Sequence, residues 1–251
     1  MLSLNQVKFL HALSVKKYRL QHQKFVVEGE KMVAELLCQQ RVAVLAVFGL
    51  EQWATDHASL LYPFLDKFQA VTAVELAKIS SLSTPNAVLA VAEMPQGAPD
   101  ISLPAYSWCF YLDGIQDPGN MGSILRVADW FGLPAVFCSP DCAEVYNPKV
   151  VQASMGAVFR VQTWEIPLST LINKQNFAVA GAVLGGENVF EADLPANGLL
   201  VIGNEGRGIA PETSVLLTHR ITIPKGPNGG AESLNAAVAS GILAAIIAAR
   251  G

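Results

Sequence analysis

The sequence predicts an α/β protein, with a mostly parallel sheet in its C-terminal part and a smaller α/β domain before it. Short apolar segments alternate with segments of helical periodicity along the whole chain, which is typical of a parallel sheet. The composition is globular, since 51% of the 251 residues are hydrophobic and 15% are charged. Three prolines and a glycine within 94–104 indicate a linker. We therefore expect a domain over 1–95, a linker over 96–105 and a second domain over 106–251.

The N-terminal part alternates between the two periodicities. A polar amphipathic helix is expected over 7–19, and helices are expected to open at 28–30 and at Thr72. The expected strands, which are short and apolar, cover 24–27, 42–48, 68–71 and 88–92.

The C-terminal part alternates more regularly. Its expected strands cover 108–112, 135–137, 158–163, 177–180, 198–202 and 220–223. Its expected helices cover 121–131, a stretch near 149–155, a short segment after Pro211 and the Ala-rich run that ends at Arg250.

Charge is distributed unevenly along the chain. The net charge of −4 taken alone argues against a nucleic-acid partner. Residues 1–27, however, hold no acidic residue and five basic ones, which are Lys8, Lys16, Lys17, Arg19 and Lys24. Such a segment is either a phosphate-binding patch or an ordinary solvated helix face, and composition does not choose between them.

Cysteine usage and hydropathy exclude several classes of protein. The four cysteines form no CxxC pair and no histidine stands at zinc spacing, so we expect reduced thiols and no metal. No signal segment opens the sequence, and the apolar run 234–249 is too short to span a bilayer. We therefore expect a cytoplasmic protein without a membrane partner.

Three polar glycine loops, over 113–126, 200–208 and 223–235, follow apolar segments and precede helix starts. Loops at the carboxyl ends of strands are where open α/β sheets bind ligands, so we expect one common site. The glycine spacing fits neither GxGxxG nor a P-loop, which excludes a nicotinamide-dependent oxidoreductase. The histidines lack a GxSxG partner, which argues against a Ser/His/Asp triad.

Individual residues of these loops have two interpretations. Arg126 and Glu205 are the charged candidates for chemistry, although an arginine on a helix is often only exposed and a loop carboxylate often only accepts backbone N–H groups. Asn120 and Ser233 stand where N-caps are expected, and Asn235 can also be structural.

The three loops resemble the three signature motifs of the SpoU/TrmH family of RNA 2′-O-ribose methyltransferases, in the SPOUT superfamily. The matching stretches are DPGNMGSILRVADWFG at 117–132, VIGNEGRG at 201–208, and Ile223-Pro224 followed by Ser233-Leu234-Asn235. Residues 25–29 and 79–85 resemble the small ribosomal-protein-like substrate-binding domain of the family. The resemblance covers nearly the whole chain.

The resemblance implies a C-terminal trefoil knot, S-adenosylmethionine as cofactor, RNA as substrate and a homodimer. It places five residues in catalysis: Arg126, Asn120, Glu205, Ser233 and Asn235. It places six in the cofactor pocket: Gly203, Asn204, Ile223, Pro224, Ser233 and Leu234. RNA is expected at the basic segment, through Lys16, Lys17, Arg19 and Lys24.

The implied reaction is methyl transfer from S-adenosylmethionine to a ribose 2′-oxygen. A guanidinium stays protonated in proteins, so Arg126 is expected to hold a phosphate and stabilise the developing alkoxide. Glu205 either takes the proton or orients Arg126. The two-domain layout favours ribosomal RNA, with transfer RNA or a non-catalytic ribosome-assembly factor as the other readings.

Overall fold

The computed structural model of the protein, which describes residues 1–82, 84–172 and 177–250, divides into two compact units. The first comprises Met1–Gly97 and Tyr146–Arg160, and the second comprises Ala98–Val145 and Val161–Gly251. The chain therefore passes between the units three times.

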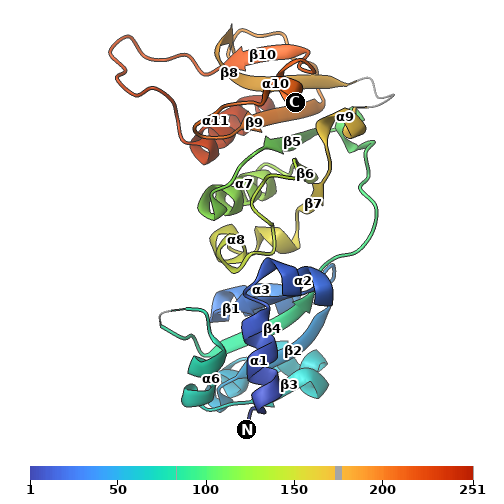
Figure 1. Ribbon diagram of the computed structural model, residues 1–251, viewed down its shortest axis with the longest axis vertical. Coiled ribbons are helices and arrows are strands. Elements are labelled where there is room, and N and C mark those ends of the chain that lie inside the picture. The colour runs from blue at the N-terminus through green and yellow to red at the C-terminus, as the bar shows by residue number, and fades with distance from the viewer. Residues whose placement is uncertain (83, 173–176, 251) are drawn as a thin grey trace. The chain divides into compact units, whose positions relative to one another are not determined.

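The first unit contains a four-stranded sheet in the order β1-β4-β2-β3 (Figure 1). β4 pairs antiparallel with both β1 and β2, and β3 pairs parallel with β2. Its elements are α1 (Leu4–Ala12), α2 (Lys16–His22), β1 (Lys24–Glu28), α3 (Glu30–Cys38), β2 (Val44–Gly49), α4 (Glu51–Asp56), α5 (Ala58–Leu61), the 3₁₀ helix η1 (Tyr62–Lys67), β3 (Phe68–Ala70), α6 (Ala73–Ile79), β4 (Val88–Glu93), α8 (Pro148–Ser154) and η3 (Ala157–Phe159).

Two capping boxes fix helix starts in this unit. Ser3 and Gln6 cap α1 reciprocally, and Thr72 and Glu75 cap α6 in the same way. Glu75 also accepts a hydrogen bond from the Leu2 backbone N–H at 2.6 Å, which ties the start of the chain to α6.

The second unit contains a six-stranded sheet in the order β10-β8-β9-β5-β6-β7, and all of its strand pairs are parallel. The elements are η2 (Leu103–Ala105), β5 (Trp108–Asp113), α7 (Pro118–Trp130), β6 (Ala135–Cys138), β7 (Gln162–Glu165), α9 (Leu168–Leu171), β8 (Ala178–Asn188), β9 (Gly198–Gly203), α10 (Pro211–Ser214), β10 (His219–Thr222) and α11 (Ala236–Ala248). The predicted α/β class with a mostly parallel sheet is confirmed, while the knot stays a prediction.

Alternate residues of the central strands face opposite layers. Tyr111 and Val201 belong to a core that includes Leu168 and Leu171 of α9 and is extended by Leu216 and Leu217 after α10. α7 and α11 pack against each other and lie side by side in Figure 1.

The predicted strand over 158–163 is wrong. Met155 and Gly156 adopt positive φ values of 49° and 92° and end α8, and Ala157–Phe159 form a 3₁₀ turn. The strand β7 begins only at Gln162. Val158 and Phe159 are apolar because they are buried in this turn, and an apolar run alone does not distinguish a turn from a strand.

Other elements differ in their bounds. The amphipathic segment forms two helices, α1 and α2, instead of one, and β8 runs well beyond the expected 177–180. α4, α5 and α9 were not expected. Ser83, within the 79–85 segment of the family resemblance, lies outside the described residues. No helix in the described part of the chain is long and apolar enough to cross a membrane.

Candidate active site

Three loops meet at one edge of the large sheet, where parallel strands end. β9 and β5 are neighbours with Ile202 opposite Leu112 and Gly203 opposite Asp113, so the loops that follow them leave the sheet side by side. The loop after β5 leads into α7, and the loop after β10 leads into α11, which packs on α7.

Asn235, Asn120 and Glu205 form a chain of hydrogen bonds across these three loops. The Nδ2 group of Asn235 donates to Oδ1 of Asn120 at 2.8 Å. The Nδ2 group of Asn120 donates to Oε1 of Glu205 at 2.6 Å. The structure thus brings together one predicted catalytic residue from each motif, and we call these three residues the amide–carboxylate chain.

Helix ends fix the direction of the amide–carboxylate chain. Oδ1 of Asn235 accepts the backbone N–H groups of Ala237 and Val238 at the start of α11, which leaves its Nδ2 as the donor to Asn120. Asp117 caps α7 by accepting the backbone N–H of Asn120 at 2.8 Å. In both bonds of the amide–carboxylate chain, the donor therefore lies on the side away from Glu205 and points toward it.

Asn204 holds the second loop against the first. Its Nδ2 donates to the carbonyl of Gly114 at 2.7 Å, and its Oδ1 accepts from the backbone N–H groups of Gly206 and Arg207 at 3.0 Å each. The polar atoms of this side chain are therefore engaged within the protein.

Gly203 allows the same loop to turn back on itself. Asn204 and Gly208 exchange two backbone hydrogen bonds, at 3.0 and 2.9 Å. A Cβ on Gly203 would lie 2.4 Å from the carbonyl carbon of Gly208 and 2.4 Å from the nitrogen of Ile209. Both are backbone atoms that cannot move aside, so glycine is required by the close approach.

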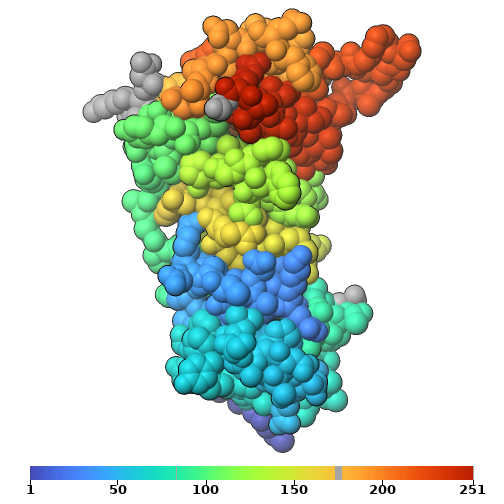
Figure 2. Space-filling model, turned by 180° about the vertical axis from the view of Figure 1, so that it is seen from behind, coloured from blue at the N-terminus to red at the C-terminus, as the bar shows by residue number. Residues whose placement is uncertain are grey.

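The third loop is open to solvent. Residues 224–235 are exposed throughout, and within 224–234, all of them described, the single main-chain hydrogen bond joins Gly229 N–H to the Gly226 carbonyl. Figure 2 shows this loop projecting from its neighbours. Ser233 lies in the loop and Ile223, half-buried, lies at its base, whereas the apolar side chain of Leu234 is 46% exposed.

Arg126 lies apart from the amide–carboxylate chain. It is exposed on α7, six residues beyond Asn120, which is about 9 Å along a helix axis. Ser233 likewise takes no part in the chain of hydrogen bonds.

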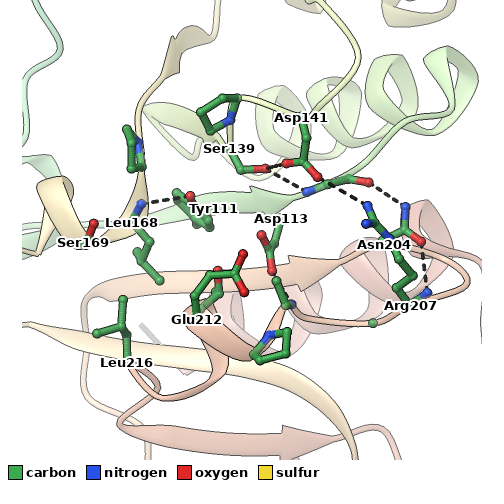
Figure 3. A pocket seen from close by; sticks show the side chains of 17 residues that line it. Tyr111, Asp113, Ser139, Asp141, Leu168, Ser169, Asn204, Arg207, Glu212 and Leu216 are labelled. Atoms are coloured by element: carbon green, nitrogen blue, oxygen red, sulfur yellow. Dashed lines mark hydrogen bonds and ion pairs between the residues drawn. The ribbon is translucent and has the colours of Figure 1, made fainter.

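A cavity of about 460 Å³ adjoins the second loop. It lies at the carboxyl ends of β5 and β6 (Figure 3), and its polar lining includes Asp113, Ser139, Asp141, Asn204, Arg207, Glu212 and Thr213. Burial raises the pKa of Asp113, and the neighbouring carboxylates of Asp141 and Glu212 raise it further. Hydrogen bonds from the N–H of Ala210 and the hydroxyl of Thr213 lower it, but less than the other effects raise it.

Most of these lining residues were missed by the sequence analysis. The signal that could have found them is position, because Ser139 directly follows β6 and Asp113 ends β5, and carboxyl ends of parallel strands line ligand sites. Among the described residues, no three His, Cys, Asp or Glu side chains are placed to hold a metal ion.

The basic segment presents fewer charges than expected. Lys16 and Lys17 are exposed, and Lys24 lies 5.7 Å above the ring of Phe9. Arg19 was expected to contact RNA, but its side chain is buried and donates to the Leu13 carbonyl at 2.8 Å. Its guanidinium therefore serves the fold and is not a surface contact.

The model of the SpoU rRNA Methylase family matches residues 107–245, which is more than half of the chain and includes all three loops. The chain belongs to this family. The predicted family and the predicted class of enzyme, an RNA methyltransferase, are confirmed. Residues 5–90 match the MRM3-like substrate binding domain.

Relatives of this SpoU-family protein match it along most of its length. The 23S rRNA (guanosine(2553)-2′-O)-methyltransferase RlmP of Bacillus subtilis is 29% identical, over 95% of this chain and 94% of that protein. A solved structure of a TrmH-family protein from Porphyromonas gingivalis is 39% identical, covers both chains fully and has a TM-score of 0.86. The SpoU methyltransferase AviRb of Streptomyces viridochromogenes, solved with AdoMet, shares the fold with a TM-score of 0.84 at 24% identity, over 99% of this chain and 98% of that one.

Proposed function

We propose that this protein transfers a methyl group from S-adenosylmethionine to a ribose 2′-hydroxyl of ribosomal RNA. The observation that carries the proposal is the amide–carboxylate chain, which joins Asn235, Asn120 and Glu205 from three separate motifs. A carboxylate held at the meeting point of three ligand-binding loops suits removal of a proton from a bound hydroxyl.

The loops after β9 and β10 fit S-adenosylmethionine. Apart from the bond between Gly229 and Gly226, the third loop leaves its backbone N–H and C=O groups free for a ligand. The partly exposed Ile223 and Leu234 offer apolar surface for an adenine ring. Gly203, Ile223 and Leu234 would hold the cofactor, with Pro224, Ser233 and Asn204 beside them. The bound cofactor supplies a methyl group activated by the sulfonium charge.

The side chains of the site have distinct tasks in this reaction. Glu205 accepts the 2′-hydroxyl proton through a lone pair that Asn120 does not use, and Asn120 and Asn235 hold its carboxylate in place. Arg126, exposed and always charged, binds a phosphate near the reacting ribose and stabilises the developing alkoxide. Ser233 hydrogen-bonds the substrate from the third loop, where it is exposed.

RNA binding is shared between two domains. We assign residues 1–95 to substrate binding, 96–105 to the linker and 106–251 to catalysis, except that the segment 146–160 packs as part of the first unit. The exposed Lys16 and Lys17, together with Lys24, contribute phosphate contacts. We also propose that the enzyme acts in the cytoplasm. No step of the reaction requires a metal ligand from the chain.

The enzyme acts as a homodimer in this proposal. α11 is apolar on nearly all sides, and Val238 remains 51% exposed on it. Trp130, at the end of the adjoining α7, is 84% exposed. Such apolar surface on two packed helices suits a second copy of the chain.

The test is methyl transfer by the purified protein from radiolabelled S-adenosylmethionine to unmodified ribosomal and transfer RNA. We expect label in ribosomal RNA as 2′-O-methylribose, and a loss of at least a hundredfold in Arg126→Ala and Glu205→Gln. Glu191→Gln, which alters an exposed carboxylate of the same unit, is the matched control. Label that enters only transfer RNA would change the proposed substrate from ribosomal to transfer RNA. Cofactor binding without methyl transfer, either to free RNA or to assembling ribosomal subunits, would favour a non-catalytic assembly factor.

A further inference from the structure

The cavity at the ends of β5 and β6 borders the loop that carries Glu205. Asn204 and Arg207, on either side of Glu205 in sequence, both line it, and so does Gly114, the first residue of the loop that leads to Asn120. Its volume of about 460 Å³ lies within the range of small-ligand sites. A group bound here would be held by the same two loops that hold the proposed catalytic residues.

The walls of the cavity differ in polarity. Leu168, Leu216 and Pro167 form an apolar side, while the carboxylates of Asp113, Asp141 and Glu212 lie on the polar side. Figure 3 shows the side chains of Asp113 and Glu212 pointing toward one another across the space. An apolar wall facing polar groups suits a flat ring, whose faces are apolar and whose edge carries donors and acceptors.

Charge decides which part of an RNA the cavity can accept. Three lining carboxylates outnumber the one lining cation, Arg207, so a phosphate would be repelled. Carboxylates accept hydrogen bonds from N–H and NH₂ groups, and arginine donates to O6 and N7 of guanine. Guanine fits both kinds of group. Its N1–H and N2 amino group form a donor pair on one edge that carboxylates can accept, and its O6 and N7 can accept from an arginine. Uracil offers a single N–H donor.

The charged groups of the cavity are available for exchange. The ion pair between Arg207 and Asp141 spans 3.4 Å, and the two side chains are 68% and 52% exposed. Such a pair contributes little to stability, so a base can replace it without a large cost. The Ser139 hydroxyl donates to Asp141 at 2.5 Å and accepts from the Gly114 N–H at 2.8 Å, which fixes one side of the cavity.

We infer that this cavity receives the base of the nucleotide whose ribose is methylated, and that Glu212, Asp141 and Arg207 select guanine there. The inference rests on the proposed function, because it names the substrate nucleotide of that same reaction. Bases of single-stranded RNA are commonly recognised by such contacts to their edges.

Nucleoside binding tests the cavity without any turnover. The probes are guanosine, inosine, adenosine and uridine, added to the whole protein and followed by saturation-transfer NMR. Guanosine is expected to bind at least tenfold more tightly than inosine, which lacks the N2 amino group, and than uridine. Glu212→Gln is expected to remove this preference, while the control Glu191→Gln keeps it. Equal binding of all four nucleosides, or a preference that survives Glu212→Gln, would overturn the inference.

Methyl transfer supplies the second test. After the modified nucleotide is mapped with the wild-type enzyme, an RNA fragment carrying guanosine at that position is compared with one carrying inosine. The wild type is expected to show at least a tenfold higher KM for inosine, and Glu212→Gln and Asp141→Asn are expected to lose this difference. A wild-type enzyme that methylates both fragments equally well would contradict the assignment of guanine to the cavity, but not the proposed function. A wild type inactive on every RNA contradicts the proposed function instead.

Discussion

At the scale of single residues, Asp113 holds a loop in place, although its surroundings disfavour the negative charge of its carboxylate. Its side chain is 5% exposed and its Oδ2 accepts the Ala210 N–H at 2.7 Å. Burial and nearby carboxylates raise its pKa above the ordinary value of 3.8. The unfolded chain therefore ionises first as the pH rises, so the wild type loses stability from about pH 4 up to the raised pKa. Asp113→Asn keeps an acceptor oxygen but has no carboxyl group to titrate, so its stability should not fall over this pH range.

Urea unfolding at a series of pH values measures this difference. The midpoint of Asp113→Asn should rise relative to the wild type between acidic and neutral pH. Asp193→Asn, at an exposed position, should show no such trend. Parallel curves for the wild type and Asp113→Asn would mean that the carboxylate titrates alike in the folded and unfolded chain.

At the scale of elements, the start of α11 combines two tasks in one side chain. Asn235 caps the helix with its oxygen and donates to Asn120 with its nitrogen. Asn235→Asp keeps the cap and loses the donor, whereas Asn235→Ala loses both. We expect Asn235→Ala to lose about 1 kcal/mol of stability and Asn235→Asp to keep it, while both lose methyl transfer. Thermal unfolding and the labelling assay separate the two effects, and an active Asn235→Asp would reduce this residue to a cap.

Elements were predictable from sequence where the pattern was long or the ends were marked. α7 was expected in nearly its place and the parallel sheet follows from alternation, but the predicted N-caps were wrong. Asp117 caps α7 in place of Asn120, and Asn235 caps α11 in place of Ser233. The turn at Ala157–Phe159 and the short helices α4, α5 and α9 were not predictable, because a few apolar residues fit several conformations. Asn120, Glu205 and Asn235 were chosen from motifs, whereas the burial of Arg19 and the grouping of Asp113, Asp141 and Glu212 depend on tertiary packing that spacing does not encode.

At the scale of the whole molecule, the proposed dimer makes a prediction about one exposed residue. Val238→Arg places a charge on the apolar surface of α11 and should convert a dimer into a monomer, because an unpaired charge in an interface is costly. Val215→Arg changes an 80% exposed valine of the same unit and should leave the dimer intact. Light scattering after size-exclusion chromatography gives the mass of each. A wild-type monomer at micromolar concentration would remove the dimer from the proposal.

The division of the chain into two units has a consequence for anyone who wishes to exchange its parts. Residues 146–160 lie far along the sequence but cluster with the first unit, where Tyr146 contacts the ring of Phe25. A gene fragment that ends at residue 97 would lack residues 146–160, which pack on the first unit. A fragment that begins after residue 97 would contain residues 146–160 without the residues they pack on. The substrate-binding unit is therefore not a transferable cassette. Chimeras with other SpoU proteins should carry residues 1–97 and 146–160 from the same parent.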